Sequence, residues 1–221
     1  MKKLCICALM FCTFFLMACG NEGSMNVQSK ELEGIERLHI DHGSTPVHIE
    51  SAEVDALEAF ISMGSYNSDI VMVQKNKELK IQLKSDLTRI INIGRKPWLT
   101  IRVPMNYEGE VLLSGSSGNV KINDLQADKL NIDSKSGNVS MDYQQINQDI
   151  HVSVYSGNVI LKLKDKDSNV KWLLKSGSGR RSVAIPWDER QDKQKSTEGL
   201  TGNGSFDVYI KTRSGNISIR E

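Results

Sequence analysis

Three histidines that lie close together in the sequence, His39, His42 and His48, are the first candidates for chemistry. Imidazole nitrogens bind zinc, and Asp41 and Glu50 stand beside them as further candidate ligands. His39 and His48 both alternate with apolar residues, so their side chains could meet across a turn. Nothing in the spacing fixes the three or four convergent ligands that zinc needs, and we therefore predict solvent-facing histidines and no metal site.

A glycine-rich segment with two arginines, residues 175–181 (KSGSGRR), offers backbone N–H groups and guanidinium groups to an anion. No helix is expected after this segment, so it is not a nucleotide-binding loop, and we interpret it as a solvated corner of the chain. Trp187, a few residues further on, is expected to cover the core rather than to hold a ligand.

Nucleophilic catalysis finds no support in the sequence. Serines are abundant, but only four histidines are present, and His151 has no acidic partner at a suitable spacing. Carboxylates are scattered along the chain rather than grouped on one face, as a glycan-cleaving solenoid would require. We therefore predict that the protein is not an enzyme and that it has no catalytic residues and no cofactor.

The N-terminus predicts export and lipid attachment. Lys2 and Lys3 precede an apolar run that ends in LMAC, residues 16–19, and this pattern resembles a bacterial lipoprotein signal peptide spanning residues 1–18. The run is too short for a stable membrane span. Cys19 would become the first residue of the mature chain and carry the lipid on its sulfur. We predict an extracytoplasmic protein of the bacterial cell envelope that is anchored to a membrane through Cys19.

Removal of the signal peptide changes both the cysteine content and the charge. Cys5, Cys7 and Cys12 leave with it and Cys19 is used for lipid, so the mature fold has no disulfide and no free thiol. The mature chain retains 26 basic and 27 acidic residues, a formal net charge of −1. This balance lacks the basic surplus that nucleic acid binding requires. The predicted partners are a membrane, through the N-terminal lipid, and an envelope protein or glycan.

Apolar and polar residues alternate with a period of two through most of the chain. Examples are LHID (38–41), LKIQLK (79–84) and ISIR (217–220), and this period is typical of strands with one buried face. The polar residues before them predict that Cys19 is followed by a flexible tether, so that residues 19–34 connect lipid and fold. We therefore predict an all-β domain over residues 35–221.

A Ser-Gly-Asn-Val or Ser-Gly-Asn-Ile tetrapeptide recurs through this domain. Complete motifs begin at Ser117, Ser136, Ser156 and Ser214, and a degenerate Ser-Gly-Ser-Gly begins at Ser176. Successive motifs are 19, 20, 20 and 38 residues apart, and the last interval is twice 19. The missing motif near residue 195 is replaced by a polar excursion loop, about residues 179–204.

The repeated motif has the properties of a corner in the backbone. Leu130 and Ile132 precede Gly137-Asn138 at even positions, whereas Val139 follows it at an odd position. The Gly-Asn pair thus bends the chain while both arms keep facing the core, and both residue types tolerate the positive φ of a sharp bend. The predicted structural corners are Gly118, Asn119, Gly137, Asn138, Gly157, Asn158, Gly215 and Asn216.

Two all-β architectures are compatible with such corners. Each Gly-Asn pair could be the turn of a hairpin, which would give an antiparallel β-sandwich or a meander of hairpins. Alternatively, each repeat of about 19–20 residues is one coil of a single-stranded β-solenoid. The constant period favours the solenoid, because stacked coils must have nearly equal length. In that arrangement the corner asparagines would form a ladder and Val120, Val139, Val159 and Ile217 a stacked apolar row.

With these motifs the chain resembles the bacterial "putative adhesin" family, a cell-envelope domain of unknown function with repeated Ser-Gly-Asp/Asn-Val/Ile coils. The segments that carry the resemblance are LTIRVP (99–104), EVLLSGSSGNVKINDL (110–125), LNIDSKSGNVSM (130–141) and GNGSFDVYIKTRSGNISIRE (202–221). The resemblance implies a β-helix-like fold and provides no catalytic residue to transfer. Asparagine stands where many relatives have aspartate, which argues against a carboxylate row that binds calcium.

The sequence therefore predicts a surface-anchored lipoprotein that acts as a non-catalytic interaction module, either adhesin-like or associated with envelope stress. A mainly structural or chaperone-like envelope lipoprotein is the alternative, and a glycan-acting enzyme is the least favoured. Nothing in the sequence indicates the oligomeric state.

Overall fold

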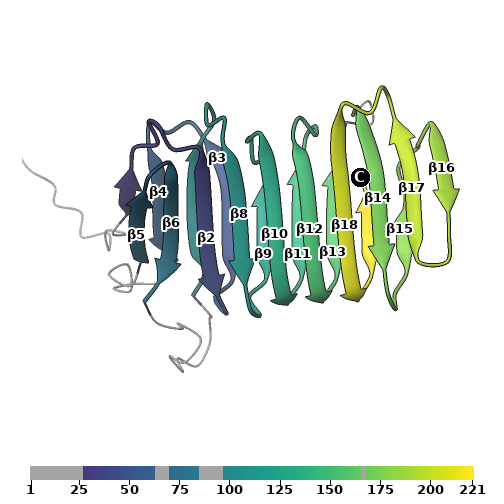
Figure 1. Cartoon of the computed structure of the whole chain (residues 1–221), viewed down its shortest axis with the longest axis horizontal. Coiled ribbons are helices and arrows are strands. Elements are labelled where there is room, and N and C mark those ends of the chain that lie inside the picture. The colour runs from purple at the N-terminus through teal and green to yellow at the C-terminus, as the bar shows by residue number, and fades with distance from the viewer. Residues whose placement is uncertain (1–26, 63–69, 85–96, 166–167) are drawn as a thin grey trace, which may run out of the picture.

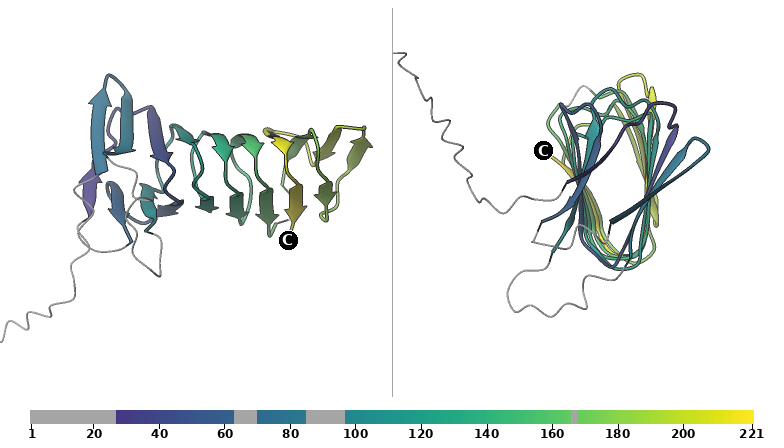
Figure 2. Two further views of the ribbon diagram at one scale, coloured as in Figure 1. Left: turned by 90° about the horizontal axis from the view of Figure 1, so that it is seen from below. Right: turned by 90° about the vertical axis from the view of Figure 1, so that its left-hand side faces the viewer.

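The structure, a computed structural model, describes residues 27–62, 70–84, 97–165 and 168–221. In these ranges the chain forms strands only, and they are arranged in two sheets that face one another across the core (Figures 1 and 2). Sheet A has nine strands and sheet B has ten. No described segment forms a helix long and apolar enough to cross a membrane. The predicted all-β fold is confirmed.

The strands lie side by side in an order that differs from their order along the chain. Sheet A consists, in spatial order, of β1 (Gln28–Lys30), β4 (Leu57–Ile61), β7 (Leu99–Pro104), β3 (Val47–Ala52), β9 (Val120–Asn123), β11 (Val139–Tyr143), β13 (Val159–Leu163), β19 (Ile217–Arg220) and β15 (Arg181–Val183). Sheet B consists, likewise in spatial order, of β16 (Glu189–Asp192), β17 (Ser196–Thr201), β14 (Val170–Ser176), β18 (Phe206–Ser214), β12 (Asp149–Ser156), β10 (Lys129–Ser136), β8 (Glu110–Gly115), β2 (Arg37–Gly43), β6 (Glu78–Leu83) and β5 (Ile70–Lys75).

The centre of the molecule is a parallel β-solenoid, as predicted. Each coil consists of a strand in sheet B, a corner and a strand in sheet A, as in β8–β9, β10–β11 and β12–β13. Equivalent residues of successive coils are in register: Leu130 pairs with Ile150, and Val139 pairs with Val159. Parallel pairing across coils excludes a meander of hairpins for this central region.

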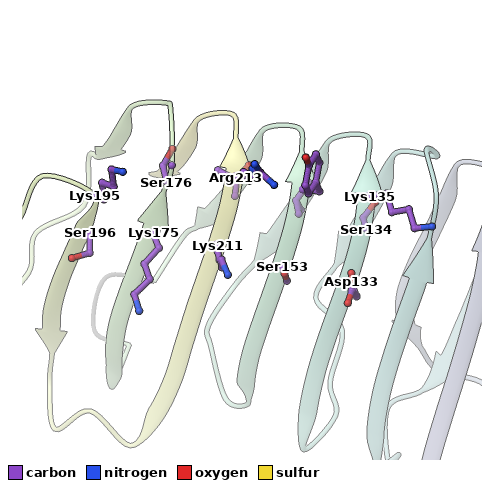
Figure 3. Close-up of a pocket in the computed structure, with 14 residues that line it drawn as sticks. Asp133, Ser134, Lys135, Ser153, Lys175, Ser176, Lys195, Ser196, Lys211 and Arg213 are labelled. Carbon is purple, nitrogen blue, oxygen red and sulfur yellow. The ribbon is translucent and has the colours of Figure 1, made fainter.

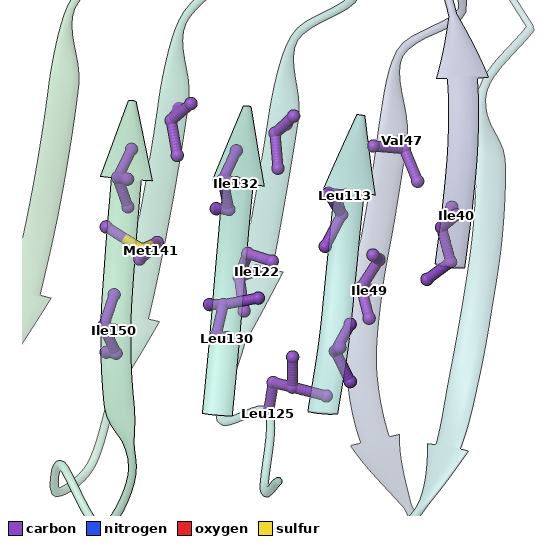
Figure 4. Packing of buried hydrophobic residues seen from close by; sticks show 14 of the residues in the cluster. Ile40, Val47, Ile49, Leu113, Ile122, Leu125, Leu130, Ile132, Met141 and Ile150 are labelled. Atoms are coloured by element: carbon purple, nitrogen blue, oxygen red, sulfur yellow. The ribbon is translucent and has the colours of Figure 1, made fainter. Parts of the chain in front are cut away.

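The core lies between the two sheets and follows the predicted change of parity. Leu130 and Ile132 of β10 are buried at even positions, and Val139 and Met141 of β11 are buried at odd positions. Figure 4 shows Leu130, Ile132 and Met141 among the apolar side chains between the two sheets. The predicted apolar row is present and is extended at its N-terminal end by Val47, which pairs with Val120.

The order of the coils in space differs from their order in the sequence at both ends of the solenoid. Coil β18–β19 inserts between β12–β13 and β14–β15, and coil β2–β3 inserts between β6–β7 and β8–β9. A missing turn near residue 195 was predicted from the sequence, and this prediction was wrong. The interval of 38 residues spans β14, β15, β16 and β17, which lie at the end of the solenoid. The chain then leads back to β18–β19, which lie beside β12–β13.

The segment 179–204 is not a polar loop, because it forms three strands that extend the two sheets. β15 extends sheet A, and β16 and β17 form an antiparallel hairpin that pairs with β14 at the end of sheet B. Trp187 lies in the connection before β16 and stacks on the buried Trp172 with ring centroids 5.3 Å apart. Its expected role in covering the core is confirmed. The hairpin ends the parallel stack with short, charged strands, which limits edge-to-edge association.

The folded part begins before residue 35, the start predicted from the sequence. β1 pairs antiparallel with β4, and Leu32 packs against the core, so residues 28–34 belong to the domain rather than to a flexible tether. The predicted signal peptide, residues 1–18, and the predicted lipid site Cys19 lie outside the described residues.

The corner asparagines form a ladder that runs along the surface of the solenoid. The backbone N–H groups of Asn138, Asn158 and Asn216 donate to the side-chain Oδ1 atoms of Asn119, Asn138 and Asn158, at 2.9, 3.0 and 2.9 Å. The backbone N–H of Arg180 continues the ladder by donating to Asn216 Oδ1 at 2.8 Å. These asparagines have no positive φ, contrary to the prediction, and they serve the corner as hydrogen-bond acceptors.

The corner glycines are required because successive corners approach each other closely. A Cβ atom on Gly137 would lie 2.5 Å from the carbonyl oxygen of Gly118, and Gly137 has a φ of +106°. On Gly157 and Gly215 a Cβ atom would lie 2.0 Å from the carbonyl of the preceding corner. The same contact occurs at Gly179, so the degenerate motif begins at residue 178 and the predicted register at Ser176 was wrong by two residues.

Replacement of a corner glycine tests the role of the corner. We expect Gly137→Val to lower the free energy of unfolding by more than about 2 kcal/mol, because it adds a strained φ and a clash with the carbonyl of Gly118. Urea denaturation measures the change, and Ser140→Val on the half-exposed face of β11 is the matched control. Equal stability of the two variants would refute the proposed constraint.

Candidate functional site

The three histidines of the predicted metal candidate are not brought together. His39 lies on the outer face of sheet B, where its Nε2 is 3.0 Å from Ser114 Oγ, and His48 lies on the outer face of sheet A beside Glu50. The two histidines therefore do not meet across the turn. Among the described residues, no group of three or more His, Cys, Asp or Glu side chains could hold a metal ion.

His42 is buried, although it was expected to face solvent. Its Nδ1–H donates to the carbonyl oxygen of Thr45 at 2.7 Å, and its Nε2 has no hydrogen-bond partner. The ring packs against Gly115, where a Cβ atom would lie 2.1 Å from Nε2. The alternation along the strand could have predicted that His42 is buried, because residue 42 continues the inward-facing series of Leu38 and Ile40.

The environment of His42 disfavours its charged form. Burial lowers the pKa of His42, because a protonated ring would place a second N–H group where the described residues offer no acceptor. Desolvation also lowers the pKa values of His48 and His151. His42 is therefore a neutral structural residue of the first corner rather than a ligand.

The glycine-rich segment 175–181 does not form an anion cradle. Its backbone N–H groups at Ser176, Gly177 and Ser178 donate to carbonyl oxygens of neighbouring strands. The Arg181 guanidinium is held by Thr197 Oγ1 and by carbonyl oxygens at the tip of the hairpin. The segment is a corner, as interpreted: its backbone N–H groups and the Arg181 guanidinium are used within the fold, whereas Lys175 faces outward from β14.

A groove on the outer face of sheet B, near the C-terminal end of the solenoid, is the strongest candidate for a binding site (Figure 3). Its volume is about 660 Å³, and it crosses β10, β12, β18, β14 and the start of β17. Lys135, Lys175, Lys195, Lys211 and Arg213 line it, whereas Asp133 is its one carboxylate. We call these residues and the surface between them the basic groove.

The register of the sheet explains why these side chains gather. Ser153 pairs with Lys211, Lys211 with Lys175, and Lys175 with Ser196, so residues far apart in the sequence form one outward-facing row. A second row follows two residues later along each strand and includes Tyr155 and Arg213. The insertion of β18 between β12 and β14 therefore creates the groove, because it supplies Lys211 and Arg213 to its centre.

The cations of the basic groove differ from those at the N-terminal end in having no acidic partners. Arg37 bonds Glu110 at 2.8 Å, and Arg102 lies within 3.4 Å of Glu50 and Glu58. Within the described ranges, no carboxylate lies at ion-pair distance from the five basic side chains of the groove. The groove therefore carries local positive charge on a nearly neutral protein.

Aromatic rings accompany the cations on this face. Tyr155 is 56% exposed, and the guanidinium carbon of Arg213 lies 4.8 Å from its ring centroid. Lys175 Nζ lies 5.5 Å from the ring of Tyr209, which also meets His151 edge-on at 4.6 Å. A second hollow of about 720 Å³ begins at these rings and continues the groove along the same sheet.

The sequence analysis did not predict the basic groove, although the repeated motif indicated part of it. Lys135, Tyr155 and Arg213 each stand directly before the serine of a complete motif, so stacked coils must place them side by side. The contributions of Lys175 and Lys195 could not be found in this way, because the register of β14 is shifted and β17 is antiparallel.

The chemistry available in the basic groove is that of binding. Ammonium, guanidinium and hydroxyl groups can donate hydrogen bonds to an anionic ligand. Among the described lining residues there is no histidine or thiol, and Asp133 pairs in register with Ser153 without a hydrogen bond that would activate the hydroxyl group. The groove therefore has the donors of an anion site and lacks a nucleophile paired with a base.

Comparison with known families agrees with this architecture. The model of the family described as Toastrack DUF4097 matches residues 35–142 and residues 110–220. The chain belongs to the Toastrack family. The two overlapping matches reflect the repeat of the Toastrack domain, since both include the coils from Glu110 to Asp142.

A solved structure has a fold similar to that of this chain. A "putative cell adhesion protein" from Clostridium sporogenes superposes with a TM-score of 0.65 at 18% identity, over 89% of this chain and 98% of the other. A "putative adhesin" from Bacteroides fragilis matches with a TM-score of 0.37 at 16% identity, over 88% and 96% of the two chains. No curated protein matches the sequence. The resemblance to an adhesin-like family is thus confirmed at the level of family and fold.

Burial of neutral His42 predicts a pH-dependent stability. Its pKa is lower in the folded than in the unfolded chain, so unfolding takes up a proton and stability falls as pH falls below about 6.5. From about pH 7 to about pH 5 we expect His42 to account for a loss of about 1 to 2 kcal/mol. His42→Asn, which keeps a donor for Thr45, should flatten this slope in urea denaturation; an unchanged slope would contradict the assignment.

Proposed function

We propose that this Toastrack protein is a bacterial lipoprotein, anchored through Cys19 on the extracytoplasmic side of a membrane, whose solenoid binds a partner in the cell envelope without chemical catalysis. The lipoprotein pattern of residues 1–19 supports export and anchoring. The description of a similarly folded protein as a "putative cell adhesion protein" is consistent with a surface role.

The basic groove is the observation that carries the binding proposal. Five cations are held at fixed positions on one sheet face with Asp133 as the one carboxylate among them, and their mutual repulsion lowers stability. A surface selected only for stability would alternate the charges, as the N-terminal end does with Arg37 and Glu110. An anionic partner offsets this repulsion, so the arrangement is suited to binding.

The position of the basic groove is suited to a partner outside the membrane. The described chain begins at β1, at one end of the solenoid, and the groove lies toward the opposite end, near β14 and β17 (Figures 1 and 2). An anchor preceding β1 would therefore leave the groove at the end away from the lipid. The solenoid then acts as a spacer as well as a scaffold.

Lipid attachment can be tested by metabolic labelling. Cells supplied with an alkyne analogue of palmitate should label the wild-type protein, whereas Cys19→Ser should remove the label because the acceptor sulfur is absent. Cys12→Ser, which changes a cysteine within the predicted signal peptide, should keep it. Label that persists on Cys19→Ser would show that the anchor assignment is wrong.

Envelope binding can be tested by cosedimentation with cell-wall and membrane fractions. The full-length protein in detergent should sediment with an envelope fraction at micromolar concentration, and raising salt from about 0.05 to about 0.5 M should release it, since screening weakens exposed charge contacts. Absence of binding to every fraction would overturn the proposed function. Binding through another surface would leave the function standing and is separated by the groove variants below.

A further inference from the structure

We propose that the basic groove binds a linear anionic glycopolymer, a polymer of the envelope that combines sugars with carboxylate or phosphate groups, laid across the strands along the long axis of the solenoid. This inference rests on the proposed binding function and names its ligand class.

The distribution of charge favours a polymer over a single small anion. The groove crosses five strands, which at a spacing of ~4.8 Å spans about 19 Å. Lys195, Lys175 and Lys211 lie at the start of β17, on β14 and on β18, three neighbouring strands, and Arg213 lies two residues beyond Lys211. Lys175 and Lys211 can meet on one anionic group, but the cations extend from Lys135 on β10 to Lys195 beside β17, so a chain with repeated anionic groups contacts more of them than one phosphate does.

The rows of outward-facing residues that pair across the strands indicate the direction in which a ligand would lie. Within a strand, outward-facing positions recur every second residue, and Asp133 and Ser153 occupy the positions that pair with the row of lysines. Across strands, Lys211 and Lys175 are direct neighbours in register. The row runs perpendicular to the strands, which is the direction of the solenoid axis, and Figure 3 shows Lys175 and Lys211 side by side in it, between Ser196 and Ser153, with Asp133 beyond.

The other lining groups are suited to sugars. Ser153 and Ser196 present hydroxyl groups in the lysine row, and hydroxyls both donate and accept hydrogen bonds. The exposed ring of Tyr155 and the adjoining ring of Tyr209 combine an apolar face with a polar tip, as sugar rings do. A polyanion without sugars would use the cations and leave these rings unused.

An acidic peptide fits the basic groove less well. Peptides commonly bind by adding a strand to a sheet edge, but the groove lies on the face of the sheet, where the backbone groups of β12, β18 and β14 pair with neighbouring strands. A membrane surface is also disfavoured, because the groove lies at the end of the solenoid away from β1 and the predicted anchor.

Binding of defined polymers tests the inference. The full-length protein in detergent is titrated with hyaluronate, a carboxylated glycan, and with poly(glycerol phosphate) bearing sugar substituents. The controls are neutral dextran, poly-L-glutamate, inorganic phosphate, poly(dT) and vesicles of phosphatidylglycerol and phosphatidylcholine in equal parts. We expect one or both anionic glycans to bind, and the one that binds identifies carboxylate or phosphate as the recognised group. Dextran should not bind.

Matched variants locate the binding. Lys175→Gln with Lys211→Gln should weaken glycan binding at least about tenfold, the equivalent of about 1.4 kcal/mol. Lys121→Gln with Lys162→Gln changes the net charge equally on the outer face of sheet A and should leave the affinity within about twofold. Tyr155→Ser, which changes no charge, should weaken glycan binding more than binding of unsubstituted polyphosphate.

The outcomes separate this inference from the proposed function. Tighter binding of poly-L-glutamate, poly(dT) or the vesicles than of either glycan would overturn the ligand class. Equal loss in the groove and control variants would overturn the location. If the protein sediments with envelope fractions but binds neither glycan, the proposed function stands and the inference fails. Circular dichroism of each variant checks that the fold is retained.

Discussion

The close stacking of one corner on the next is the constraint on which the structure depends. The carbonyl oxygen of each corner glycine occupies the place where a Cβ atom of the next would stand, and the side chain of each corner asparagine accepts the next backbone N–H. Both contacts are possible only if successive coils have the same path. The period of 19 to 20 residues, the alternation of buried residues and the parallel register of both sheets all follow from this condition.

A stack built in this way has two open ends, and the fold protects them by changing the order of its coils. The first and last coils of the described chain, β2–β3 and β18–β19, lie inside the stack and pair on both sides. Antiparallel strands end sheet B, with β5 at one end and the hairpin of β16 and β17 at the other. Long unpaired parallel edges are a liability for aggregation, and the other three end strands, β1, β15 and β16, have only three or four residues. The same rearrangement brings β18 beside β14 and so assembles the basic groove.

The solenoid separates the residues that maintain the fold from those available for binding. Inward positions are fixed by the core, where Leu130, Ile132 and Val152 must fill a closed space. Outward positions contribute less to stability, so their charges can serve a partner. At the N-terminal end these charges neutralise one another, as Arg102 does with Glu50 and Glu58, whereas at the C-terminal end they leave Lys175 and Lys211 unpaired within the described part of the chain. One scaffold thus carries a neutral region beside the predicted anchor and a basic region far from it.

The all-β class, the coil, the corners and the buried face could be predicted from the amino-acid sequence, because each depends on local periodicity or on a short motif. Leu130 and Val139 could be assigned to the core from parity alone, and the same rule would have placed His42 there. Apolar and polar residues do not alternate clearly in β16 and β17, so this hairpin was predicted as a loop. The order of the coils, the register of Ser178 and the convergence of Lys195 with Lys211 emerge only in the complete fold. Each requires residues distant in the sequence to pair, and pairing is settled by the packing of the whole stack rather than by any one segment.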